Sequence, residues 1–394
     1  MNKILLAFAA CVISLGSAWA QSEPTRDIRI IYIDRAEDPF YDPPPQTDGV
    51  IRIENKPPMA GAELGLKDVT ALGRAANVRF ILEHHTVAAD GDVAADLSAI
   101  ANSLPAFVLL DLPHDDLVVA AKAVQPGSLA LVNIRDTSDD LRRTLCGTAL
   151  FHTIPSQSAY SDALAQMIVR KNWKRVLTLI GPEPEDQELA KIFTVSAKKF
   201  GAKIVDTKPF IAGNDPRKRE ENSTALMTGD SDYDVIYVAD TTGDFGRFVE
   251  FRQVKPRPVI GSEGLEASAW HRSAERYGAP QVNHRFERDA GRVMSDMDWS
   301  AWVAIKAAAE AVAREKAYSG PAISAALLAG KIDIEMTKGI PGSFRSWDHQ
   351  LRQPIMLHTA DAVIAMAPIE GFLHENSILD TLGLSDRDTN CRTK

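Results

Sequence analysis

Residues 343–355, SFRSWDHQLRQPI, place an acid beside an imidazole, Asp348 next to His349, with Arg345 and Arg352 on either side. An aspartate that orients a histidine can support general acid–base chemistry. Adjacent residues on an extended chain point to opposite faces, however, so this pair is badly placed to act as a dyad. We therefore interpret the stretch as structural rather than catalytic.

Motifs of known enzyme classes are absent from the sequence. It contains no G-x-S-x-G, no H-E-x-x-H, no Walker loop and no G-x-G-x-x-G. His84, His85 and His114 are isolated, and the spacing of Gly243 and Gly246 is typical of a strand-to-helix turn rather than of a dinucleotide loop. The sequence thus predicts a protein without catalysis. An enzyme with an unrecognised hydrolase site is the alternative.

The first twenty residues have the pattern of a secretory signal peptide. Lys3 supplies a positive start, residues 4–16 are largely apolar, and residues 18–20 read Ala-Trp-Ala, a typical cleavage site. A membrane anchor would need about twenty uninterrupted apolar residues, which this run does not reach. A lipoprotein signal at Cys11 is another alternative. We expect residues 1–20 to be removed on export.

Charge and cysteine content narrow the partners further. The formal net charge is −9, so neither nucleic acid nor an anionic membrane surface is electrostatically favoured, and no later apolar run could span a bilayer. After export two cysteines remain, Cys146 and Cys391, which in an oxidising compartment predicts one disulfide. Two buried free thiols are the alternative. Without a neighbouring histidine pair, we expect no structural zinc site.

Apolar strand-like runs alternate with helical patterns along most of the chain. This alternation indicates parallel sheets that are covered by helices on both faces. The pattern occurs in two sets, before and after about residue 150, so we predict an α/β protein with two doubly wound lobes. The expected strands are 28–33, 78–85, 106–112, 129–134, 175–181, 203–210, 234–240 and 258–262.

Ligands of such sheets meet the loops at the carboxyl ends of the strands. After the strand at 129–134 come Arg135 and Asp136. The guanidinium of Arg135 could hold a ligand carboxylate through two hydrogen bonds, although an ion pair with Asp139 or Asp140 is an equal alternative. The same rule nominates three residues beside later strands: Asp240, Thr241 and Glu263.

Residues 149–181 resemble the crossover segment of type I periplasmic binding proteins of the branched-chain amino acid family. The matching residues are Phe151, Thr153, Pro155, Ser156, Lys174, Arg175 and Val176. The resemblance extends over essentially the whole exported chain and implies two lobes, joined by a hinge of three crossovers, that clamp a ligand. It implies a first lobe of residues 26–152 and 284–343 and a second of residues 153–283 and 344–394.

The same resemblance implies a role in the periplasm. The partner would be an inner-membrane ABC permease, or a sensor kinase if the protein reports its ligand. In the related receptors an acid of the second lobe meets the ligand ammonium, which suggests Asp240 or Glu263, although either could instead cap a helix. Tyr160 matches an aromatic position that closes on ligand, with core packing as the alternative. A hairpin is implied between strands at 344–347 and 352–357.

Aromatic and basic residues in the later part of the chain suggest a particular ligand. Trp270 follows the Glu263 loop, and Trp299 and Trp302 share one helix face. Three arginines lie nearby: Arg285, Arg288 and Arg292. Indole faces with guanidinium groups suit a flat anionic aromatic molecule.

Residues 285–311, together with 343–355, resemble a subgroup found alongside alcohol oxidation systems that depend on pyrroloquinoline quinone (PQQ). We therefore expect PQQ, or a similar planar polycarboxylate, as the bound ligand. The alternative is an amino acid or a small organic acid, with the tryptophans buried in the core. In either case we expect no cofactor for catalysis.

Overall fold

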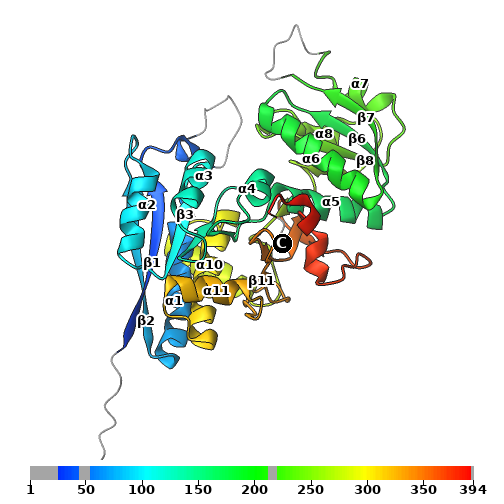
Figure 1. Ribbon diagram of the computed structural model, residues 1–394. Coiled ribbons are helices and arrows are strands. Elements are labelled where there is room, and N and C mark those ends of the chain that lie inside the picture. Colours follow the sequence, from blue (N-terminus) through cyan, green and yellow to red (C-terminus); the bar gives the residue numbers. More distant parts are fainter. Residues whose placement is uncertain (1–24, 44–53, 212–219, 392–394) are drawn as a thin grey trace, which may run out of the picture.

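Two separate parallel sheets organise the chain into two lobes (Figure 1). The computed structural model describes residues 25–43, 54–211 and 220–391, so the signal peptide expected at residues 1–20 lies outside the described residues. Within these ranges no helix combines the length and the apolar character that crossing a membrane requires.

The first sheet contains five strands in the order β2-β1-β3-β4-β5. Their bounds are β1 Arg26–Arg35, β2 Val78–Val87, β3 Phe107–Asp111, β4 Ala130–Asn133 and β5 Leu150–His152. Every residue of β3 and β4 is buried, as expected for strands with apolar side chains on both faces. The helices between them are α1 Met59–Ala75, α2 Val93–Asn102, α3 His114–Ala123 and α4 Asp139–Thr144.

The second sheet repeats this arrangement with four strands in the order β7-β6-β8-β9. The strands are β6 Arg175–Ile180, β7 Lys203–Pro209, β8 Val235–Ala239 and β9 Val259–Gly261. Its helices are α5 Gln157–Arg170, α6 Pro184–Phe200, α7 Thr224–Gly229 and α8 Val249–Arg252. Leu177 and Leu179 of β6 face one apolar cluster and Val176 faces another, so this sheet too is covered on both sides.

The chain then returns to the first lobe and afterwards crosses back to the second. Helices α9 Ala279–Ala290, α10 Asp296–Glu315 and α11 Gly320–Leu328 join the first-lobe core, with α10 packed along α1. A small antiparallel sheet, β10 Glu266–Ser268, β13 Ile355–His358 and β14 Val363–Ala367, packs on α5 of the second lobe.

Three passages therefore connect the lobes: after β5, between β10 and α9, and between α11 and β13. This arrangement confirms the expected α/β fold of two doubly wound lobes with a hinge of three crossovers. The residue boundaries given above for the lobes stay a prediction.

The stretch at 343–355 forms part of the third crossover. Strands β11 Ser343–Phe344 and β12 Leu351–Arg352 are shorter than expected, and the turn between them holds Asp348 and His349. Asp348 accepts a hydrogen bond from the backbone N–H of Gln350 at 3.0 Å and lies beside Arg345. The His349 ring instead bonds the carbonyl of Leu150 at 3.1 Å, so the two side chains have separate, structural partners.

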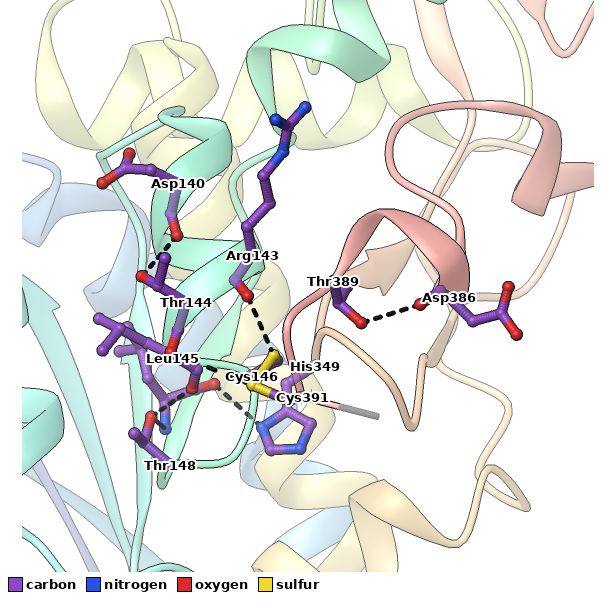
Figure 2. The surroundings of a disulfide bond; sticks show 11 residues. Asp140, Arg143, Thr144, Leu145, Cys146, Thr148, His349, Asp386, Thr389 and Cys391 are labelled. Atoms are coloured by element: carbon purple, nitrogen blue, oxygen red, sulfur yellow. Dashed lines mark hydrogen bonds between the residues drawn. A yellow bond between two sulfur atoms is a disulfide. The ribbon is translucent and has the colours of Figure 1, made fainter. Parts of the chain in front are cut away.

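Cys146 and Cys391 form the expected disulfide, with Cα atoms 5.7 Å apart. Figure 2 shows that the bond joins the segment after α4 to the C-terminal end of the chain. The sequence separation of 245 residues makes this a long-range link.

We expect the close approach of α1 and α10 to tolerate no added side chain at Gly61. A Cβ atom there would lie 2.0 Å from the carbonyl oxygen of Asp298, so Gly61→Ala must separate the helices and should cost about 1–3 kcal/mol of unfolding free energy. Urea denaturation measures the loss. The matched control is Gly229→Ala, where nothing lies within 4 Å of the added atom and the stability should not fall. Equal losses in both variants would contradict the packing argument.

Candidate functional site

A cavity of about 520 Å³ lies between the two lobes. Its first-lobe side is formed by the segments after β1 and β4 and by the start of α10, and its second-lobe side by α5, α6, β8 and the β9–β10 region. Carboxyl ends of strands from both sheets thus face the same space, where ligands of α/β sheets bind. Residues that line the cavity include Phe40, Arg135, Tyr160, Ser161, Glu266 and Asp296.

Arg135 lines the cavity, but two carboxylates already hold its guanidinium. Its Nη1 atom lies 2.6 Å from Asp38 and 3.3 Å from Asp111. The guanidinium also stacks over the ring of Phe40, 4.4 Å from the centroid. The partners suggested by the sequence, Asp139 and Asp140, are not the ones observed. The positive charge is therefore offset within the first lobe.

Glu266 presents the least compensated charge of the cavity. Its strand β10 places the half-buried side chain on the second-lobe side, and no described residue donates a hydrogen bond to its carboxylate. Burial, together with the neighbouring Glu263, raises the pKa of Glu266 to about 7. A positively charged ligand group would relieve both the repulsion and the missing hydrogen bonds.

Asp296 connects the two lobes at the edge of the cavity. It is the first residue of α10, and its carboxylate accepts a hydrogen bond from the Tyr160 hydroxyl of α5 at 2.7 Å. The backbone N–H groups of Ala269 and Trp270 each donate to it at 2.8 Å. This set of donors satisfies much of the carboxylate and fixes Tyr160 across the boundary between the lobes.

One polar side chain of the cavity has no protein partner. The Oγ atom of Ser161, on α5, is buried without a hydrogen bond in the described part of the chain, although the residue lines the cavity. Buried hydroxyl groups normally have a partner, so the Oγ atom of Ser161 is available for a hydrogen bond to a ligand in the cavity. Ser161 lies directly beside Tyr160 on the same helix.

The structure gives several predicted site residues structural partners instead. Asp240 accepts hydrogen bonds from the N–H groups of Phe245 and Gly246 at 3.0 and 2.6 Å, so it holds the loop after β8, as the capping alternative anticipated. Thr241 donates its hydroxyl to Asp186 at 2.8 Å. Neither residue is part of the cavity wall.

Two more predicted residues lie close to the cavity without lining it. Asp136 accepts from the backbone N–H of Ser138 at 2.6 Å and pairs with His114 at 2.9 Å, which shapes the loop after β4. Glu263 lies against the loop that Asp240 holds, and burial raises the pKa of its carboxyl group.

The tryptophans expected to stack on a ligand ring lie in the core. Trp299 and Trp302 are 0% and 1% exposed, and Trp270 packs parallel to Trp299 with centroids 6.1 Å apart. Trp302 donates its indole N–H to Asp68 at 3.0 Å. Their spacing on α10 thus reflects core packing, the alternative noted above, rather than a cavity face.

The three nearby arginines are also committed to first-lobe ion pairs outside the cavity wall. The pairs are Arg285 with Asp68 at 2.9 Å, Arg288 with Asp289 at 2.8 Å and Arg292 with Asp298 at 2.6 Å. Carboxylates of α1, α9 and α10 therefore pair with the three arginines that the sequence analysis assigned to a polyanionic ligand.

Of the residues that the sequence suggested for a ligand, Arg135 and Tyr160 line the cavity, which is also lined by Glu266, Ser161 and Asp296, none of which the sequence analysis suggested. The sequence could have placed Asp296 at the start of a helix, because Ser295 and Asp298 form a capping box there. Within the described ranges, no group of three or more histidine, cysteine or acidic residues could hold a metal ion.

No known protein family model and no curated protein match the sequence. Solved structures do match its fold. The leucine-, isoleucine-, valine-, threonine- and alanine-binding protein of Brucella ovis is 11% identical, with a TM-score of 0.63 over 87% of this chain and 92% of that one. A branched-chain amino acid transporter substrate-binding protein from Streptococcus pneumoniae, in complex with isoleucine, is 17% identical, with a TM-score of 0.58 over 86% and 99%.

A solute-binding protein of an ABC transporter from R. palustris, in complex with benzoate, is 12% identical, with a TM-score of 0.56 over 86% and 96% of the two chains. The chain thus has the two-lobed fold of type I periplasmic binding proteins.

Proposed function

We propose that this chain is the periplasmic solute-binding protein of an ABC transporter and binds a small zwitterionic ligand, an amino acid, between its lobes. The observation that carries the proposal is the cavity between the lobes, with the unpaired Glu266 on one side and Arg135 on the other. An ammonium group would meet Glu266, and a carboxylate would meet the donors around Arg135 and Ser161. The protein binds and releases this ligand without chemical change.

Charge balance favours an amino acid over a polyanion. Asp38 and Asp111 offset Arg135, while Glu266 and Asp296 add negative potential to the same space. The negative potential of the cavity would repel a tricarboxylate such as PQQ. The tryptophans and arginines that were expected to bind PQQ do not line the cavity. Two of the similar structures carry isoleucine or benzoate, which are small ligands with a single carboxylate.

Titration calorimetry of the exported chain tests the ligand class directly. The panel is isoleucine, leucine, phenylalanine, benzoate and PQQ. We expect saturable binding of an amino acid with a dissociation constant of about 1 μM or tighter, equivalent to about −8 kcal/mol. Binding of PQQ alone would overturn the proposed ligand class, and silence across the panel at tens of micromolar would count against the cavity as an amino acid site.

A second measurement addresses the partner. The transport role predicts that the loaded protein co-purifies with an inner-membrane permease that docks on both lobes. Recovery of a membrane sensor kinase instead would assign the same binding protein to signalling.

A further inference from the structure

The C-terminal tail is anchored first in the second lobe. The short helix η4 Ile378–Thr381 ends at Thr381, whose hydroxyl accepts a hydrogen bond from Gln166 of α5 at 3.0 Å. The N–H of Gly383 donates to the buried Asp162 of α5 at 2.8 Å. Leu382 belongs to the apolar cluster around α5, α6 and β8. Residues 381–383 are therefore held by the second lobe, and the carbonyl of Leu384 is held next to it by Arg345 and Trp347 of the third crossover.

The last described residues are anchored in the first lobe instead. The N–H of Asn390 donates to the carbonyl of Arg143 in α4 at 2.9 Å, and Cys391 is bonded covalently to Cys146. The segment that carries Cys146 is fixed by Leu141 and Leu145, which are buried in the apolar cluster around β3 and β4. Figure 2 shows the disulfide beside α4, with the tail entering from the other side.

Only a short strap joins these two anchors. Residues 385–389 contain the helical turn η5 Asp386–Asp388, which is closed by hydrogen bonds between Ser385 and Asp388. Six residue steps separate Leu384 from Asn390, which gives a reach of about 20 Å when fully extended. Because residues 386–388 are coiled in η5, the strap can lengthen mainly by unwinding that turn.

We propose that this strap, closed by the Cys146–Cys391 disulfide, is a fourth connection between the lobes that limits how far and how often they separate. Both lobes and the strap line one groove of about 1060 Å³, with Asp140 from α4, Ile192 from α6 and Asp388 from the strap among its walls. Rotation that moves α4 away from α6 must be taken up within residues 385–389. This restraint acts on the lobes whichever ligand is bound.

Three versions of the exported chain test the strap without any ligand. The first is the wild type and the second is the double variant Cys146→Ser/Cys391→Ser. The third keeps the disulfide but carries a flexible Gly-Ser insertion of about six residues between Leu384 and Ser385, which doubles the strap. Small-angle scattering measures the radius of gyration. Hydrogen exchange measures the amide of His152, the last residue of β5, which bonds the carbonyl of His349 in the third crossover.

We expect both altered proteins to have a larger radius of gyration than the wild type. The His152 amide should exchange about threefold faster or more when the strap is doubled, the factor that loop-closure entropy gives for a doubled length. Amides inside β1 and β6 are internal references for intact lobes and should keep their protection.

Two outcomes would overturn the proposal. If both altered proteins have the radius of gyration and the His152 exchange rate of the wild type, the strap does not restrain the lobes. A change confined to the serine variant, with the lengthened strap behaving as wild type, would show that the disulfide acts by local stabilisation. If the serine variant fails to fold, the variant with the Gly-Ser insertion tests the proposal alone, because it retains the disulfide.

Discussion

Replacing Glu266 by Gln should weaken binding of isoleucine, or of the amino acid that binds best, by about thirtyfold. This factor corresponds to about 2 kcal/mol, at the lower end of the cost of removing one partner of a desolvated charge pair. The reason is that Glu266 is the cavity carboxylate without a hydrogen-bond donor among the described residues, so the ligand ammonium has its strongest acceptor there. Calorimetry of the two proteins at pH 8 measures the difference.

The same residue should make binding depend on pH. The pKa of Glu266 is raised to about 7 in the free protein, so the carboxylate is mostly charged at pH 8 and mostly protonated at pH 6. A bound ammonium favours the charged form, and binding at pH 6 must displace the proton. The dissociation constant should therefore rise about tenfold between pH 8 and pH 6.

The groups around Glu266 do not reverse this sign. Glu263 repels its charge, and burial raises the pKa of Glu263 as well. His358, the cross-strand neighbour on β13, has its pKa lowered by burial, which favours the neutral ring beside Glu266. Protonation of the acids thus governs the dependence.

Glu266→Gln should bind with little dependence on pH, which separates this residue from general effects of charge. The control is Glu287→Gln, an exposed residue of α9 outside the cavity, for which affinity and pH dependence should match the wild type. An unchanged tenfold rise in the Glu266→Gln variant would assign the proton to another group and remove Glu266 from the ammonium site.

Arg142→Met should lower the free energy of unfolding by about 3–5 kcal/mol, because it removes the hydrogen-bond donors of four oxygen atoms around the hinge. The guanidinium of Arg142 bonds the side chain of Gln350 at 2.9 Å and the carbonyl of Ile154 at 2.9 Å, so it joins the first and third crossovers. It also bonds the carbonyls of Asp136 and Ser138. A methionine fills similar space but leaves these acceptors without donors.

The matched control lies next to it in the same helix. Arg143 is exposed, so Arg143→Met should change the stability by no more than about 0.5 kcal/mol. Urea denaturation at neutral pH gives both values from the midpoint and slope. Coincident curves for Arg142→Met and Arg143→Met would mean that the buried guanidinium does not stabilise the hinge.

Local patterns in the sequence determined the architecture. Alternating apolar strands and helices predicted two parallel sheets, because a strand covered on both faces must be apolar at successive positions. The opposite directions of adjacent side chains ruled out an Asp348–His349 dyad. Two cysteines in an exported chain predicted the bond between Cys146 and Cys391. Each conclusion depends on a regularity that local sequence or composition already contains.

The electrostatics of the cavity were decided only by the tertiary structure. Arg135 pairs with Asp38, 97 residues earlier, and not with the acids next to it in the sequence. The indoles of Trp299 and Trp302 face the core because the partner surface of α10 is α1, which no local pattern specifies. The role proposed for Glu266 rests on its folded surroundings, in which no described residue donates a hydrogen bond to its carboxylate. Charge pairing and burial are properties of three-dimensional neighbours, and the sequence alone does not name them.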